Sequence, residues 1–136
     1  MIDIEVKEID WVLEKEHIDA IVFGLKQLDL TYAPVTLIIE CSSLGEGHHG
    51  DTVDLDEEIV LRLSNDSEWR RTLWHELAHV KQYVNDELEL ESEYAVWKGK
   101  LIKRTEYWDE PWEIEAREIE EKMEHVYRRN YELHQV

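Results

Sequence analysis

The stretch His75-Glu76-Leu77-Ala78-His79 constrains the fold of this 136-residue chain more than any other feature. Its two histidines are four residues apart, so on an α-helix with about 3.6 residues per turn both imidazoles lie on one face. Two rings placed in this way can reach the same metal ion, and Glu76 then points from a neighbouring face to the space beside that ion. The stretch therefore has to be helical if it is to bind a metal.

The residues around this stretch favour a helix. Residues 68–84 contain no Gly or Pro, and apolar residues recur there at helical intervals: Leu73, Leu77, Val80 and Val84. Four polar residues at 64–67 provide several possible N-caps just upstream. We therefore expect a helix that buries its apolar side and projects the two histidines from an adjacent stripe. The alternative is a surface helix whose histidines are solvated or satisfied within the core.

A second helix can supply a third ligand, which a hydrolytic zinc site needs in addition to an open position. Pro111 suits a first helical turn, and the following run to about Tyr131 has no helix breaker. Glu113 and Glu115 are two residues apart on this helix, so they point in different directions and only one of them can reach the metal. We prefer Glu115, because the small Ala116 directly after it would let the two helices approach closely. The alternatives are Glu113 as the ligand, or two glutamates on a solvated face.

The two motifs, residues 75–82 and residues 111–116, together resemble small gluzincin-type zinc metallopeptidase domains. Such domains occur in phage and bacterial proteins and are distantly similar to the ImmA/IrrE-type peptidases. The resemblance covers about residues 35–125. No third histidine follows His79 in a Gly-containing extension, so a metzincin is not indicated.

The resemblance implies a zinc-dependent metallopeptidase that acts on peptides or proteins. His75, His79 and Glu115 would hold Zn²⁺, and Glu76 would be the general base that takes a proton from the attacking water. In this family the glutamate ligand typically precedes an alanine, which agrees with Glu115. Tyr107 is a candidate by its position alone: its hydroxyl could donate to the oxyanion that forms when water attacks a carbonyl. The alternative is that Tyr107 only packs in the core or the cleft wall.

Length and composition predict one domain over residues 1–136. The hydrophobic fraction of 43%, with six Trp and six Tyr, is too high for a disordered acidic chain. No apolar run approaches the roughly 20 residues that span a bilayer, and the amino terminus lacks the features of a signal peptide. Cys41 is the only cysteine, so an internal disulfide is impossible. We therefore expect a cytoplasmic protein that does not associate with membranes.

The formal net charge of −18 is the second unusual feature. The few basic clusters are flanked by acidic residues, so we expect no direct binding to nucleic acid. The acidity serves solubility or adaptation to a salty interior, or it attracts basic substrates or partners. Independently of the charge, a small peptidase is open to control by a protein partner or inhibitor. The charge also leaves an alternative function open, in which a catalytically inactive metallopeptidase fold acts as an acidic interaction protein or a nucleic-acid mimic.

Hydrophobic patterns predict an α+β fold. Apolar residues alternate over residues 2–6, which indicates a short strand, and their spacing over residues 10–30 indicates an amphipathic helix. Further strands are expected at residues 35–40, 52–55 and 58–63, and the last of these is expected to turn Ile59, Leu61 and Leu63 inward. A hairpin is expected to turn near Gly99.

With the resemblance, these elements predict a small zincin-like domain. It would consist of an N-terminal helix, a small and mostly antiparallel sheet, the histidine helix and a C-terminal helix that carries the third ligand. Glycines indicate a loop over residues 42–50, where His48 and His49 are expected to be solvated.

Overall fold

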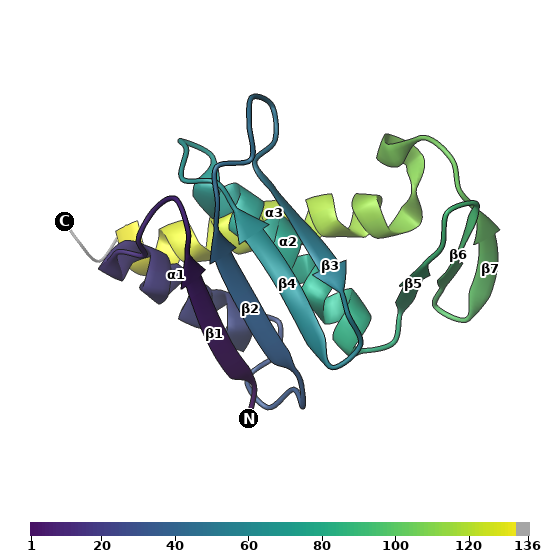
Figure 1. The fold of residues 1–136 in the computed structure, drawn as a ribbon, viewed down its shortest axis with the longest axis horizontal. Coiled ribbons are helices and arrows are strands. Elements are labelled where there is room, and N and C mark those ends of the chain that lie inside the picture. Colours follow the sequence, from purple (N-terminus) through teal and green to yellow (C-terminus); the bar gives the residue numbers. More distant parts are fainter. Residues whose placement is uncertain (133–136) are drawn as a thin grey trace.

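The computed structural model describes residues 1–132 as a mixture of helices and strands, which confirms the predicted α+β class in its coarse form. A four-stranded sheet carries the α-helices on one face, and a three-stranded sheet projects beside it (Figure 1). The strands of the larger sheet are β1 (Asp3–Glu8), β2 (Thr36–Cys41), β3 (Gly50–Asp54) and β4 (Glu58–Leu63). Those of the smaller sheet are β5 (Leu88–Leu90), β6 (Tyr94–Trp97) and β7 (Lys100–Lys103).

Three α-helices belong to the described part of the chain: α1 (Lys15–Gln27), α2 (Trp69–Val84) and α3 (Pro111–Tyr127). A short 3₁₀ helix, η1 (Tyr107–Asp109), precedes α3, and a π-helical turn, η2 (Arg128–Glu132), follows it. Among the residues described, no helix combines the length and the apolar character that crossing a membrane requires.

The larger sheet has the strand order β1-β2-β4-β3. Its β1–β2 and β2–β4 pairs are parallel, and only β3 runs antiparallel to its neighbour β4. The prediction of a mostly antiparallel sheet is therefore wrong for this sheet, although the smaller sheet is antiparallel throughout. Helix α1 carries the chain back along the sheet between β1 and β2, and β3 carries it back between β2 and β4, so these three strands run in the same direction.

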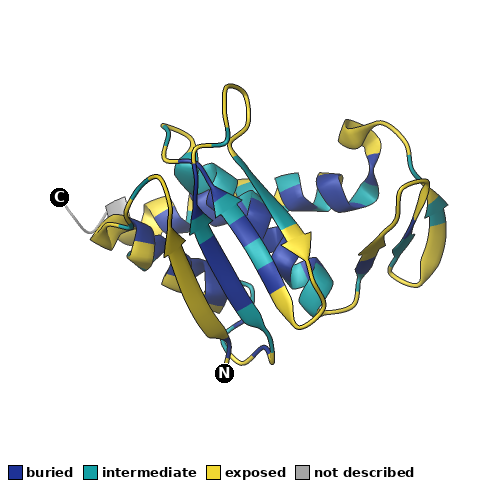
Figure 2. Ribbon diagram, in the orientation of Figure 1, coloured by how far each residue is buried: buried dark blue, intermediate teal, exposed yellow. Residues whose placement is uncertain are grey.

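Alternating residues of the central strands form the core between the larger sheet and the helices. Residues 59, 61 and 63 of β4 are buried, as predicted, and lie in register with buried residues 37, 39 and 41 of β2. From the helix side, α2 contributes four fully buried apolar side chains to this core: Leu73, Trp74, Leu77 and Val80. Figure 2 shows this burial in β2 and β4, whereas β1 at the edge is exposed. Burial of each large aliphatic side chain is worth about 1.5–3 kcal/mol, so this layer holds α2 firmly against the sheet.

Helix α1 is shorter than its predicted span of residues 10–30. At its start, Glu14 and His17 form a capping box in which the Glu14 N–H donates to Nδ1 of His17 at 3.0 Å. At its end, Asp29 takes a left-handed φ of 57°, and the N–H of Leu30 donates to an earlier carbonyl at 2.8 Å. The two caps satisfy the end groups of the helix and limit its length.

The histidine helix and the hairpin are confirmed where the sequence predicts them. Helix α2 begins after Asp66, whose Oδ1 accepts the N–H of Glu68 at 2.8 Å. The β6–β7 hairpin turns at Lys98 and Gly99, whose φ values of 50° and 83° are typical of a type I′ turn. Local signals therefore set both elements.

A buried carboxylate joins α2 to α3. Glu124 of α3 accepts hydrogen bonds from Nε of Arg70 at 2.9 Å, from Nη2 of Arg70 at 3.0 Å and from Nε1 of Trp74 at 3.0 Å. Burial opposes ionisation of Glu124, but these donors lower the pKa of its carboxyl group. The ionised carboxylate therefore stabilises the packing of the two helices.

We predict that Glu124→Gln lowers the free energy of unfolding by about 1.5–3 kcal/mol, because Arg70 and Trp74 lose a charged acceptor. As a control, Glu118→Gln at an exposed position of the same helix should change it by less than about 0.5 kcal/mol. Denaturant unfolding followed by circular dichroism measures both differences.

The same pair of proteins tests the pH dependence. The pKa of Glu124 is lowered in the folded protein, so its contribution is present above the ordinary glutamate value of about 4.3 and is lost as the pH falls through the folded value. The difference between wild type and Glu124→Gln should therefore shrink between pH 7 and pH 3. A constant difference would contradict a role for the charge.

Candidate metal centre

Helix α2 places His75 and His79 one turn apart, with their ring centroids 5.0 Å from each other. The Nε2 atoms of both rings face Oε1 of Glu113 on α3, at 2.9 Å from His75 and 3.1 Å from His79. His79 and Glu113 are buried, and the side chain of His75 is only 12% exposed. The ligand atoms of these three residues, which we call the triad, all lie within 4.8 Å of one another. They are close enough to share one metal ion.

Glu113 reaches the histidines because of where α3 begins. Pro111 is the first residue of the helix, so Glu113 lies in its first turn, near the positive end of the helix dipole. Ala116 follows Glu113 by three residues and therefore lies on nearly the same face, where it is fully buried. Its small side chain allows α3 to lie close to α2 at the level of the triad.

The structure therefore places Glu113, and not the predicted Glu115, beside the two histidines. Glu115 lies about 200° around the helix from Glu113. It instead accepts hydrogen bonds from Nζ of Lys98 at 2.8 Å and from Nζ of Lys81 at 3.2 Å. The sequence-based preference linked Ala116 to the residue directly before it, but adjacent helical residues diverge by about 100°, whereas residues three apart share a face.

Side chains behind the triad fix the orientation of both imidazoles. Nδ1 of His79 lies 2.8 Å from Oε1 of Gln82, which is fully buried, and Nδ1 of His75 lies 3.1 Å from Oε1 of Glu120. Both acceptors favour the tautomer with the proton on Nδ1, so both Nε2 atoms can bind a metal. The amide of Gln82 in turn donates to Glu115 at 3.2 Å. Glu115 thus supports the triad from outside it.

Glu76 occupies the position beside the triad that the motif predicts. Its Oε1 accepts a hydrogen bond from Oγ1 of Thr52 on β3 at 2.8 Å. Burial raises the pKa of Glu76, against the opposing effect of the two histidines. Gly50 lies against this side chain, since a Cβ atom there would be 3.4 Å from Cγ of Glu76 and 2.7 Å from Cγ2 of Thr72. The start of β3 therefore holds Glu76 close to the helix that carries it.

The triad forms a tightly coupled charge cluster. Burial disfavours a charged Glu113, but hydrogen bonds from His75 and His79 lower the pKa of its carboxyl group to about 2. Burial likewise disfavours a charged His75, yet its carboxylate partners raise the pKa of the imidazole to about 9. The cluster therefore favours a protonated imidazole beside the ionised carboxylate of Glu113. Because a metal ion binds neutral imidazoles, it has to displace the protons that they carry.

A cavity of about 810 Å³ opens on the triad from the side of His75. Tyr107 and Trp108 of η1 line it, and the hydroxyl oxygen of Tyr107 lies 3.5 Å from Nε2 of His75. A smaller cavity of about 170 Å³ lies on the side of His79 and Glu113 and shares Tyr107 with the larger one. The structure thus brings Tyr107 to the triad, between two spaces that a ligand can enter.

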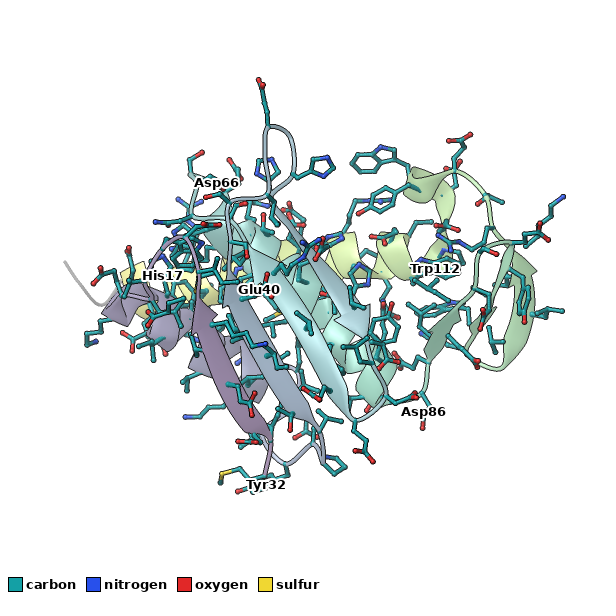
Figure 3. The ribbon with its side chains drawn as sticks, in the orientation of Figure 1. His17, Tyr32, Glu40, Asp66, Asp86 and Trp112 are labelled. Atoms are coloured by element: carbon teal, nitrogen blue, oxygen red, sulfur yellow. The ribbon has the colours of Figure 1, made fainter. Side chains whose placement is uncertain are left out.

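The loop between β2 and β3 lines the larger cavity with His48 and His49. Both residues are exposed, which confirms the prediction for this loop. The ring of His49 is not free, since its Nδ1 lies 2.7 Å from Oδ2 of Asp66, whose other carboxylate oxygen accepts the N–H of Glu68 just before α2. Figure 3 labels Asp66 at the foot of this loop. Neither histidine belongs to the triad.

Three residues that contact the site were missed by sequence reasoning: Gln82, Glu120 and Thr52. Helical spacing contains a signal for two of them, because Gln82 follows His79 by three residues and Glu120 follows Glu113 by seven. Thr52 gives no such signal, since its contact with α2 depends on how the sheet packs. Once the triad is known, helical spacing in the sequence therefore predicts Gln82 and Glu120 but not Thr52.

The donor set of the triad suits zinc. Two imidazole nitrogens and one carboxylate oxygen leave one tetrahedral position open, as in hydrolytic zinc sites. Ligand atoms of a tetrahedral site with bonds of about 2.1 Å lie about 3.4 Å apart, close to the observed N–O distances of 2.9 and 3.1 Å. Cys41 is buried in β2 and lies outside the triad.

We predict that Glu113→Ala weakens zinc binding at least about 100-fold, since loss of an outer partner alone costs about 10–100-fold. Glu115→Ala removes a carboxylate from the same turn of α3 but leaves the triad intact. The zinc affinity of this variant should therefore fall by at most about tenfold. Competition with a chromophoric chelator measures the affinities, and elemental analysis measures the stoichiometry. Zinc retained by Glu113→Ala and lost by Glu115→Ala would restore the sequence-based assignment.

No protein-family model matches this chain, and no curated protein and no solved structure is significantly similar to it. An α+β arrangement by itself is compatible with many activities. The function is therefore inferred from the residues of the site and their geometry, and the gluzincin resemblance stays a prediction.

Proposed function

We propose that this protein is a zinc-dependent metallopeptidase that hydrolyses peptide bonds in peptides or proteins. One observation carries the proposal: Nε2 of His75, Nε2 of His79 and the carboxylate of Glu113 converge beside an open cavity, with Glu76 next to them. Three protein ligands with an open fourth position are typical of hydrolytic zinc sites, whereas structural zinc sites are closed by four protein ligands that are rich in cysteine.

The residues of the site divide the chemical work. The triad would hold Zn²⁺, which when bound supplies the positive charge that polarises the scissile carbonyl. Glu76 is the general base, which takes a proton from the attacking water and passes it to the leaving amine. The hydrogen bond from Thr52 holds one carboxylate oxygen of Glu76, so the other oxygen can receive that proton. Both cavities reach Glu76, so a peptide that lies across the triad passes this carboxylate.

Tyr107 has the position and the protonation state of a hydrogen-bond donor to the developing oxyanion. Its hydroxyl oxygen lies 3.5 Å from Nε2 of His75. Partial burial of the phenol, and after it the charge of Glu113, raises its pKa, so the hydroxyl keeps its proton at neutral pH. A neutral donor next to the triad can follow the carbonyl oxygen as negative charge builds on it.

We predict that Glu76→Gln still binds one zinc ion but lowers kcat/KM at least about 100-fold, because the amide cannot accept the proton of the water. Glu118→Gln, an exposed change of the same type on α3, should leave both properties unchanged. A peptide library analysed by mass spectrometry measures turnover. Cleavage by Glu76→Gln at the wild-type rate would refute the assignment of the base.

A second candidate function is favoured by the net charge of −18. A catalytically inactive protein of this kind would use its acidic surface to bind a basic partner. It would bind that partner tightly and cleave no peptide even with zinc bound. Cleavage by the zinc-loaded wild type that a chelator abolishes would decide for the peptidase, whereas stoichiometric binding of a basic protein without any cleavage would decide for the interaction protein.

A further inference from the structure

Residues 105–109, which we call the Tyr107 turn, form part of the cavity wall but bury little of their own surface. Tyr107 is 52% exposed and Trp108 is 66% exposed, and no residue of η1 is buried. Its backbone hydrogen bonds are local: the N–H of Asp109 donates to the carbonyl of Glu106 at 2.9 Å, and the N–H of Glu110 donates to the carbonyl of Tyr107 at 3.3 Å. A segment with so little packing needs side-chain contacts to stay in one position.

An ion pair closes the base of the Tyr107 turn. Arg104, directly before the turn, donates from Nε at 2.7 Å and from Nη2 at 3.2 Å to the two carboxylate oxygens of Glu110, directly after it. Glu110 is 2% exposed, so the pair is well shielded from water. This pair fixes the two ends of the turn, but it does not reach the two aromatic residues at the tip.

The tip is held by Arg117 of α3. Nη2 of Arg117 donates to the carbonyl of Trp108 at 2.5 Å, and its guanidinium carbon lies 4.5 Å from the centroid of the Trp108 ring. The contact thus combines a charged hydrogen bond with a cation–π interaction. It joins the turn to the same helix that carries Glu113.

Arg117 makes this contact instead of an ion pair. Four other arginines each bind a carboxylate: Arg62, Arg70, Arg71 and Arg104. Within the part of the chain that the structure describes, Arg117 forms no ion pair, although Glu113 and Glu121 lie one helical turn away on either side. Its Nη1 is buried without a hydrogen-bond partner. The contacts of the Arg117 guanidinium are therefore those with Trp108.

We propose that Arg117 is a positioning residue, which binds Trp108 and thereby keeps the hydroxyl of the adjacent Tyr107 beside the triad. That hydroxyl lies 3.5 Å from Nε2 of His75. A turn that moved away from α3 would carry the hydroxyl away from this position. A displacement of about 1 Å at a reacting centre can cost about 100-fold in rate. The catalytic part of this inference rests on the proposed peptidase function, and the structural part does not.

Hydrogen exchange tests the structural part without any assay of activity. Arg117→Met keeps the apolar stem of the side chain and removes the guanidinium, and Lys122→Met removes the same charge from an exposed position of α3. In Arg117→Met, the amides of Asp109 and Glu110 should exchange at least about tenfold faster, a change of about 1.4 kcal/mol in opening free energy. In Lys122→Met they should exchange as in wild type. Equal protection in wild type and Arg117→Met would overturn the proposal.

Kinetics of the zinc-loaded full chain test the catalytic part. Arg117→Met and Tyr107→Phe should each lower kcat by about 10–100-fold with little change in KM, because a donor to the transition state is displaced or removed. The double variant should lose no more than Tyr107→Phe alone, since Arg117 acts through Tyr107. Multiplied losses, or a change confined to KM, would show that Arg117 does not position Tyr107. If wild type shows no turnover, the proposed function fails, and the exchange rates still decide whether Arg117 holds the turn.

Discussion

The Nε2 atoms of His75 and His79 share one carboxylate oxygen of Glu113. The elements around this contact hold the three side chains in place. The sheet fixes α2 through a layer of fully buried side chains, so the two histidines have a rigid base. Helix α3 approaches α2 closely at Ala116, and Glu124 holds the two helices together further along. The smaller sheet packs on Trp112, next to Glu113, and so supports the start of α3 (Figure 3). Each of these contacts limits how far Glu113 can move from the histidines.

Local patterns in the sequence were sufficient to predict most helices and strands and to place His75, Glu76 and His79 together. They were not sufficient to select Glu113. The alternation in β4, the helical spacing around His75 and the turn at Gly99 depend on neighbouring residues, and the structure confirms all three. The direction of the strands was not readable in this way, because it depends on where α1 returns the chain. Zinc, the general base and the oxyanion donor stay predictions, since they concern chemistry and not the path of the chain.

The choice between Glu113 and Glu115 shows where reasoning from single residues reaches its limit. Both carboxylates lie near the start of the same helix, and both have their pKa lowered by partners on other elements. Which one meets the histidines depends on the rotation of α3 about its axis. In the observed rotation, Ala116 is buried three residues after Glu113, on nearly the same face, and Lys98 of the hairpin turn binds Glu115. A pattern that considers only adjacent residues cannot detect either effect.

His75 and Glu113 are 38 residues apart in the chain, and this separation has a consequence during protein synthesis. At translation rates of about 5–20 residues per second, the histidine pair is made roughly 2–8 s before its glutamate partner. In that interval the ribosome makes the smaller sheet and η1. A nascent chain therefore carries Glu76 and both histidines of the triad before it carries Glu113. If the proposed hydrolysis depends on the full triad, it can begin only after Glu113 has been made and α3 has packed against α2.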